Sequence, residues 1–171
     1  DGALYTAGFA LSAGLEGRVF GANMGVVTTP VTTAATTAIT DTIAHGWVRV
    51  PDGTLIVPLY ASIIIESSGA TTQIEASILI AQNDIGASGA AATVGPVSLN
   101  TAVPVTSACT ARQLATASTA PTNPIELTRF SAAASAVNQR LEWSVAELAF
   151  SPIVRGAGTW AFYLGGNAVV Y

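Results

Sequence analysis

The sequence predicts an all-β protein: an antiparallel β-sandwich of the jelly-roll or Greek-key type, preceded by an extended N-terminal arm. Two segments alternate apolar and polar side chains with a period of two, which is typical of strands with one buried face. Two long connections, 83–96 and 106–124, interrupt otherwise local hairpins. This combination favours a Greek-key sandwich of eight or nine strands. An immunoglobulin-like sandwich is the second choice, because one cysteine cannot form its disulfide.

Residues 1–17 are predicted to form the arm and residues 18–171 a single sandwich domain. Gly2, Gly8 and Gly14 recur every six residues, and so many glycines argue against a stable helix. We therefore expect a terminal segment that becomes ordered against a neighbouring molecule.

The next part of the chain is predicted to hold short strands and one hairpin. Arg18–Phe20 and Val26–Thr29 flank a glycine-rich stretch. Trp47–Val50 and Thr54–Val57 are separated by Pro-Asp-Gly at 51–53, whose residues suit a tight turn. We expect the last two strands to pair with each other.

The two alternating segments are Leu59–Glu66 and Thr72–Gln82, with a turn expected at 67–70. Their spacing predicts an antiparallel pair with one buried face. Pro58 precedes the first segment; because proline cannot donate to a ladder, a bend or a sheet edge is expected there.

The middle of the chain is predicted to be mostly loop. Asn83–Pro96 is rich in glycine and alanine, and 106–124 is a polar connection. Between them, Val97–Val105 is expected to form one or two short strands, and Ile125–Phe130 forms a strand after the second connection.

The last part is predicted to contain an alternating strand, a bulge and a hairpin. Arg140–Val145 alternates, and the phase of the pattern then shifts by one residue, which predicts a β-bulge near Ala146 and Glu147. Thr159–Leu164 and Ala168–Tyr171 are expected to pair as the closing hairpin. One core is expected to contain Ile63, Ile65, Ile74, Ile78, Ile80, Leu141, Trp143 and Val145.

The composition predicts a surface that is covered by other molecules. Only 9% of the 171 residues are charged, against about 25% in a typical soluble domain. Few charged groups guard strand edges, so we expect self-association. The net charge of -4 disfavours a nucleic-acid partner, and so does the dispersal of the arginines. The six arginines are residues 18, 49, 112, 129, 140 and 155. The longest apolar run, Leu55–Ile65, is too short for a membrane span, which needs about 20 residues.

Candidate catalytic and metal-binding residues are few. The chain has one histidine, His45, and one cysteine, Cys109, so a zinc site within one subunit is not expected. His45 precedes Gly46 and is interpreted as a structural turn residue, although a trimer axis would bring three copies together. Cys109 has no basic neighbour to lower the pKa of its thiol and is interpreted as a small packing residue.

Other residue combinations give only weak functional signals. The carboxylates Glu66, Glu75, Glu142 and Glu147 would be the candidates for glycoside hydrolysis, but the first three fall on the solvent phase of their strands. No Gly-x-Ser-x-Gly frames a serine nucleophile, and Asn83-Asp84 lacks the further carboxylates of a calcium loop. The tryptophans are interpreted as packing anchors, with sugar stacking as the alternative; they are Trp47, Trp143 and Trp160.

Gly46–Glu66, together with Thr72–Gln82, resembles structural β-sandwich proteins of tailed-phage virions, especially those that decorate or cement capsids. The composition, rich in alanine, threonine and glycine and poor in charge, is similar over the whole chain, as is the glycine-rich arm. The resemblance implies a jelly-roll knob on the capsid surface, usually a trimer, whose arm clasps neighbouring capsid subunits.

The functional expectation is therefore a non-enzymatic structural virion protein, a capsid decoration or cement protein. Its expected partners are other copies of itself, with a trimer favoured, and the major capsid protein or another assembly subunit. No catalytic, metal or cofactor-binding residue is assigned. The alternative is a glycan- or receptor-binding module that uses aromatic side chains; an enzyme with a hidden site is the third hypothesis. Sugar binding that is abolished by tryptophan-to-alanine changes would favour the alternative.

Overall fold

The computed structural model describes residues 9–24, 38–66, 73–88, 92–113, 117–133, 139–145 and 152–166. These residues form one short helix and antiparallel β-strands, so the predicted all-β class is confirmed. The elements are α1 (Phe9–Leu15), β1 (Phe20–Gly21), β2 (Gly46–Val50), β3 (Leu55–Ile56), β4 (Tyr60–Ile65), β5 (Gln73–Ala81), β6 (Ala87–Ser88), β7 (Ala92–Val94), β8 (Val97–Ser98), β9 (Thr110–Gln113), β10 (Ala117–Ser118), β11 (Ile125–Ala133), β12 (Gln139–Ser144), β13 (Val154–Arg155) and β14 (Gly158–Gly165).

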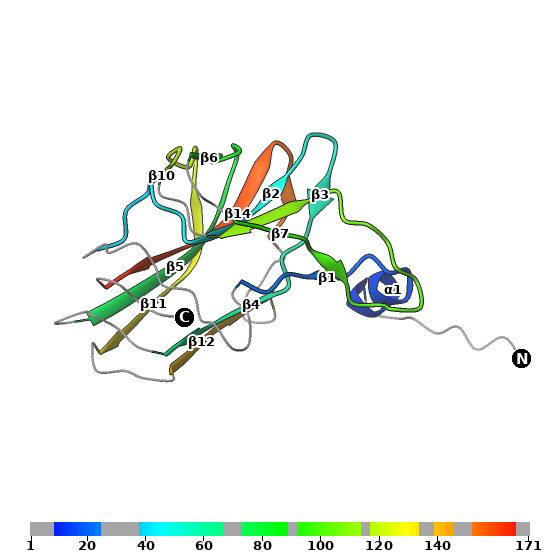
Figure 1. The fold of residues 1–171 in the computed structure, drawn as a ribbon, viewed down its shortest axis with the longest axis horizontal. Helices are drawn as coiled ribbons and strands as arrows, with labels where there is room; N and C mark the ends of the chain where they lie inside the picture. Colours follow the sequence, from blue (N-terminus) through cyan, green and yellow to red (C-terminus); the bar gives the residue numbers. More distant parts are fainter. Residues whose placement is uncertain are drawn as a thin grey trace, which may run out of the picture.

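The main sheet has six strands in the order β11-β5-β14-β2-β9-β7, and every neighbouring pair is antiparallel (Figure 1). Beside it lie four two-stranded sheets, which are β1-β8, β10-β6, β12-β4 and β13-β3. Four of the five neighbouring pairs in the main sheet join strands that are far apart in sequence; the fifth pair, β7 and β9, is close in sequence.

Six of the ladders follow one rule: the chain runs out and folds back on itself as a long ribbon. β2 pairs with β14, β3 with β13, β4 with β12, β5 with β11, β6 with β10, and β7 with β9. Two further ladders, β14 with β5 and β2 with β9, join different turns of this ribbon. The ribbon is thus wrapped so that its own edges meet.

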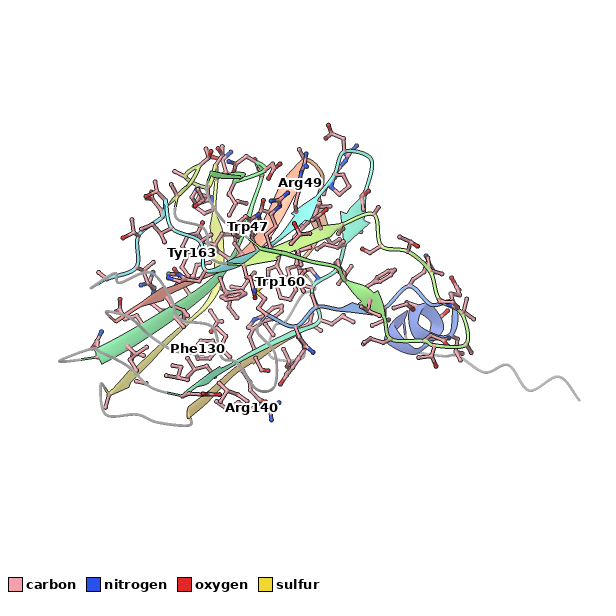
Figure 2. The ribbon with its side chains drawn as sticks, in the orientation of Figure 1. Trp47, Arg49, Phe130, Arg140, Trp160 and Tyr163 are labelled. Atoms are coloured by element: carbon pink, nitrogen blue, oxygen red, sulfur yellow. The ribbon has the colours of Figure 1, made fainter. Side chains whose placement is uncertain are left out.

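The main sheet buries side chains on both faces. On one face, Ile63 and Ile65 of β4 pack with Ile74, Ala76 and Leu164 of β5 and β14. Trp143 of β12 reaches Trp160 of β14 on this same side, with ring centroids 6.1 Å apart. The strands β4 and β12 therefore form a second layer below the main sheet, and Figure 2 places Phe130 and Trp160 between the two layers.

The opposite face of the main sheet carries a second apolar cluster. Trp47 of β2 and Tyr163 of β14 pack there with Ala161, Ala44 and Ile85. The residues that cover this cluster come from the segment before β2 and from the connection between β5 and β6. The expected core thus corresponds to the first cluster, and the second cluster, on the opposite face of the main sheet, was not predicted.

The predicted alternating strands exist, and their buried phase is largely confirmed. Five of the eight predicted core side chains are almost fully buried: Ile63, Ile65, Ile74, Ile78 and Trp143. The remaining three, Ile80, Leu141 and Val145, are half-buried. Ser77 shares the phase of Glu75, which was expected to face solvent, but it is 2% exposed because the main sheet is covered on that face as well.

Both predicted early hairpins are wrong, although the turn between the first pair is present. Thr54 N–H donates to the Pro51 carbonyl at 3.1 Å, and Gly53 adopts a φ of 76°. However, β2 lies between β14 and β9, and β3 pairs with β13. In the same way, β4 pairs with β12 while β5 lies between β11 and β14. Both edges of β2 and β5 are thus occupied by distant strands, so the turns lead from one sheet to another.

The N-terminal arm is not extended throughout, because residues 9–15 form α1. The glycines did not prevent the helix; instead, Gly17, with a φ of 71°, ends it. Arg18 N–H donates to the Ala13 carbonyl at 2.8 Å and Gly17 N–H donates to the Gly14 carbonyl at 3.0 Å, which is the Schellman pattern of a helix C-terminus.

The predicted loops contain strands that the sequence analysis missed. β6 and β7 lie within 83–96, and β9 and β10 lie within 106–124. β9 belongs to the main sheet, where it pairs with both β2 and β7. Val26–Thr29, the bulge near Ala146 and Glu147, and the partner strand Ala168–Tyr171 lie outside the described residues. A register shift is present elsewhere, between Glu126 and Thr128 of β11.

Candidate interaction surfaces

The first candidate surface is a module at one end of the molecule, made of residues 9–21 and 97–106; we call it the α1–β8 module. Phe20 pairs with Ser98, and the Ser98 hydroxyl donates to the Gly17 carbonyl at 3.0 Å. The Asn100 side-chain amide donates to the carbonyls of Gly14 and Leu15 at 3.0 and 3.2 Å. These bonds fix α1 to the segment after β8, and α1 projects away from the main sheet (Figure 1).

The α1–β8 module exposes large apolar side chains. Leu15, Val97 and Leu99 are each about two-thirds exposed, at 66%, 67% and 66%. Val103 and Val105 add a further exposed pair. The module contains two charged residues, Glu16 and Arg18, and these form an ion pair with each other. The surface is therefore apolar and carries no net charge.

The second candidate surface is a depression of about 490 Å³ at the junction of β5, β11 and β13. Ile125 and Ile153 line it and are 53% and 56% exposed. Arg155 is the one charged residue in the lining, and it forms no ion pair with any residue that the structure describes. We call this hollow the apolar depression; its full lining is Ile80, Ala81, Gln82, Asn123, Ile125, Ile153, Val154, Arg155, Gly156 and Ala157.

The outer face of β4 and β12 is more polar. Tyr60 and Ile64 are exposed, but the Tyr60 hydroxyl donates to Glu142 Oε1 at 2.8 Å and accepts from Arg140 Nη2 at 2.6 Å. Arg140 and Glu142 also form an ion pair. Figure 2 shows Arg140 at the outer side of this layer. Tyr60, Arg140 and Glu142 therefore bond to one another on this face.

His45 has a structural role in the core. Its side chain is 1% exposed, and Nδ1 accepts the Leu164 N–H at 2.9 Å. Its own backbone N–H donates to the Phe162 carbonyl at 3.1 Å, which continues the contact between β2 and β14. Burial lowers the pKa of His45 to about 4, so the ring is neutral near pH 7. Among the described residues, no three His, Cys, Asp or Glu side chains gather as metal ligands.

Cys109 lacks the surroundings of a reactive thiol. Its side chain is half-buried, and burial raises the pKa of the thiol. The thiol is therefore protonated at neutral pH, whereas nucleophilic attack requires the thiolate. Its backbone N–H donates to the Ser107 hydroxyl at 3.1 Å.

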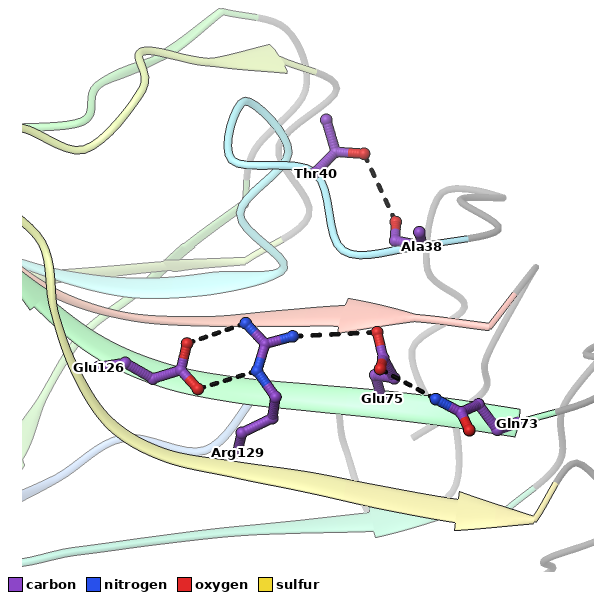
Figure 3. A network of polar contacts seen from close by, with 6 residues as sticks. All are labelled: Ala38, Thr40, Gln73, Glu75, Glu126 and Arg129. Atoms are coloured by element: carbon purple, nitrogen blue, oxygen red, sulfur yellow. Dashed lines mark hydrogen bonds and ion pairs between the residues drawn. The ribbon is translucent and has the colours of Figure 1, made fainter.

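The candidate catalytic carboxylates are engaged with arginines or exposed to solvent. Arg129 forms two hydrogen bonds of 2.9 Å to the carboxylate of Glu126, and its Nη1 lies 3.9 Å from Glu75 (Figure 3). The hydrogen bond from Arg129 lowers the pKa of Glu126. Glu142 is held by Arg140, Glu66 is exposed, and Glu147 lies outside the described residues. Of the candidates that the structure describes, Glu75 and Glu142 are thus paired with arginines.

The loop that contains Asn83 and Asp84, which the sequence analysis judged too poor in carboxylates for calcium, is held by other protein groups. Arg49 Nε lies 2.7 Å from Asp84 Oδ2, and Asp84 Oδ1 accepts the Gly86 N–H at 3.0 Å. The Asn83 side chain donates to the Ala120 carbonyl and accepts from the Thr122 N–H. These residues therefore fasten the loop to its neighbour, and their oxygen atoms already have partners.

The tryptophans are packing residues. Trp47 and Trp143 are each 1% exposed, so neither presents a ring face to a sugar. Trp160 is half-buried against Trp143. Two of the three tryptophans that would support a glycan site are therefore buried.

Sequence analysis missed the residues of the two apolar surfaces. The uncharged segment 97–105 was interpreted as one or two short strands. Its large apolar residues share one phase, with Ser98 and Asn100 in the other, and this phase was the available signal; the structure exposes it instead of burying it. Ile125 and Ile153 meet only in the folded chain.

Comparisons with protein families, with curated proteins and with solved structures find no match to this chain. Among the helices of the described residues, none has the length and apolar character needed to cross a membrane.

Proposed function

We propose that the wrapped ribbon is a jelly roll in which β2, β14, β5 and β11 form one sheet and β4 and β12 belong to the other. The nested ladders support this proposal, because a jelly roll is a double-sheet fold built from two Greek keys. One feature departs from the pattern: β6 and β10 lie near Ile85, which packs on the face opposite to β4 and β12. In this proposal, the β6–β10 part of the ribbon has been displaced to cover the second apolar cluster.

We further propose a non-enzymatic structural role: the chain is a capsid decoration or cement protein on the virion surface, bound to the major capsid protein or to another assembly subunit. The observation that carries this proposal is the α1–β8 module, a projecting, uncharged apolar surface at one end of the molecule. Exposed apolar patches of this kind mark sites of protein contact. The proposal includes self-association, with three subunits as the favoured number.

The structural role also agrees with the polar groups of the molecule. His45, Asp84, Glu126 and Glu142 are engaged by backbone or arginine partners rather than directed into a shared cavity. The charged side chains thus contribute to the stability of the fold, and the apolar side chains of the α1–β8 module remain for binding.

The test is binding to virions. Particles from the natural source are purified and searched for this chain by mass spectrometry and by immunogold labelling, and recombinant chain is then added to particles depleted of it. Leu99→Asp should weaken binding at least tenfold, because burying a leucine side chain contributes about 1.5–3 kcal/mol. Ile64→Asp, an exposed position on β4, is the matched control and should bind normally. Particles without the chain, or equal binding of both variants, would contradict the proposal.

A further inference from the structure

The apolar depression has two walls, and each is fixed by hydrogen bonds of the chain itself. One wall joins the end of β5 to the segment before β11, where Asn123 Nδ2 donates to Gln82 Oε1 at 2.9 Å. The other wall is the segment 153–157, which contains β13 and is paired through it with β3. Gly156 N–H donates to the Thr54 carbonyl at 3.0 Å and fastens this wall to the turn before β3. The depression is therefore pre-formed, as most small-molecule sites are.

The apolar residues of the depression lie at two depths. Ala81 and Val154 are buried and Ile80 is half-buried, whereas Ile125 and Ile153 are exposed. The volume of about 490 Å³ lies within the range of about 300–1,000 Å³ that is typical of small-molecule sites. An apolar ligand of that size would remove the two exposed isoleucine side chains from water, which is favourable.

The charge of the depression comes from one arginine that has no carboxylate partner among the described residues. Four of the six arginines form an ion pair with a carboxylate of this chain, and they are residues 18, 49, 129 and 140. Arg112 and Arg155 form none with any residue that the structure describes, and of these two only Arg155 borders the depression. The lining contains no aspartate or glutamate. Because a guanidinium group binds a carboxylate through two parallel hydrogen bonds, the depression favours a carboxylate.

The polar groups of the lining favour a ligand with a single polar end over a peptide segment. A peptide would bring an N–H and a carbonyl group at each residue, and each of these needs a partner when it is buried. The lining has few partners to give, because Asn123 Nδ2 and Gln82 Oε1 bond to each other and Gly156 N–H bonds to the Thr54 carbonyl. A ligand with one anionic end and an apolar body requires only Arg155.

We propose that the apolar depression binds an alkyl carboxylate, with the carboxylate on Arg155 and the alkyl chain against Ile80, Ile125 and Ile153. The Arg155 side chain is exposed, so its guanidinium group holds the carboxylate at the rim, where both charges keep contact with water. The ion pair therefore avoids the cost of full burial. Burial of the alkyl chain supplies the affinity, and Arg155 selects the head group. This site is separate from the α1–β8 module and does not depend on the proposed virion role.

Decanoate is the probe, and its binding to the full-length chain is measured by isothermal titration calorimetry below its micelle concentration. With roughly twelve non-hydrogen atoms, it should bind with a Kd of about 1 mM or below. Amide chemical shifts in heteronuclear NMR spectra should change at residues 123–125 and 153–157 and stay constant at residues 97–105. Decyltrimethylammonium has the same alkyl chain and the opposite charge. It should bind at least about fivefold more weakly, although the net charge of -4 on the whole chain attracts cations.

Two variants separate the contact with the head group from the contact with the alkyl chain. Arg155→Gln should abolish the preference for decanoate over decyltrimethylammonium, and Arg112→Gln is its matched control. Ile153→Ser should weaken the binding of both compounds by about threefold or more and keep the preference. Ile64→Ser, an exposed isoleucine on β4, is the control for that loss. Melting temperatures confirm that each variant folds, and the comparison of the two compounds on the wild type needs no variant.

Several results would overturn the inference. They are decanoate binding that does not saturate, chemical-shift changes at residues 97–105, equal affinity for the two compounds, and an Arg155→Gln variant that keeps the wild-type preference. A tripeptide of isoleucine, glutamate and isoleucine, blocked at both ends, is titrated as well. If it binds more tightly than decanoate, the ligand is a protein segment and the assignment of an alkyl carboxylate is wrong. None of these measurements involves particles, so their failure would leave the virion role to its own test.

Discussion

The stability of the protein should depend on pH through its single histidine. His45 is 1% exposed, and it is needed as a neutral acceptor for the Leu164 N–H. Because burial lowers its pKa from 6.5 to about 4, the ring stays neutral in the folded chain at pH values where the unfolded chain is already protonated. Protons then favour the unfolded state.

The size of the effect follows from the two pKa values. Above pH 6.5 the ring is neutral in both states and contributes no pH dependence. As the pH falls from 6.5 toward 4, the free energy of unfolding should decrease by up to about 1.4 kcal/mol per pH unit, and by about 3 kcal/mol in all. Below pH 4 both states are protonated and the loss is complete.

The assay is urea denaturation at pH values from about 7.5 to about 4.5, with the wild type and His45→Asn compared at each pH. Asparagine offers an acceptor for the Leu164 N–H but has no ionisable group, so the variant should lack the decrease. Arg129 lowers the pKa of Glu126, so protonation of Glu126 in acid also lowers the free energy of unfolding, but by the same amount in both proteins. Parallel curves for the wild type and the variant over this range would refute the reasoning.

Three further substitutions test the core, the thiol and the module. Ile78→Asp places a carboxylate at a position that is 2% exposed, so it should lower the free energy of unfolding by about 4 kcal/mol or more and give insoluble protein. Ile64→Asp, at an exposed position, should stay soluble. Wild-type melting of Ile78→Asp would contradict the core assignment. Cys109→Ser should change the free energy of unfolding by less than about 0.5 kcal/mol, and a loss above about 2 kcal/mol would indicate an intermolecular disulfide. Gly17→Ala should destabilise the α1–β8 module by at least about 1–2 kcal/mol, because the position has a φ of 71° and a Cβ would collide with the Val103 carbonyl oxygen. We expect faster proteolysis between residues 9 and 21 and an unchanged melting temperature of the sheets. Unchanged proteolysis would contradict this prediction.

The strands themselves could be predicted where one side chain in two is buried. β4, β5 and β12 were found from alternation, and Ile63, Ile74 and Trp143 are buried as expected. Alternation fails for β9, whose four residues include Arg112 and Gln113, because so short a strand carries almost no periodic signal. Its place in the main sheet depends on β2 and β7, which hold it from both sides.

The helix was missed because glycine was weighed only as a helix breaker. Gly14 does lower the helix propensity, but Gly17 supplies the left-handed residue that ends α1, and Asn100 supplies donors to its last carbonyls. That partner lies more than eighty residues away, so the local sequence cannot reveal it.

The choice of strand partners was beyond the sequence for a related reason. Alternation says which face of a strand is buried, but it is the same for every partner that could lie beside that strand. β4 and β5 are adjacent in sequence and both alternate, yet β4 pairs with β12 and β5 with β11 and β14. What separates them is the need to cover both faces of the main sheet: β4 and β12 bury one cluster, while Ala44 and Ile85 bury the other. A local β4–β5 hairpin would fit the alternation of both strands, but it would remove β5 from its place between β11 and β14 in the main sheet. The pairing is therefore selected by the burial of the whole sheet, which no segment of the sequence expresses by itself.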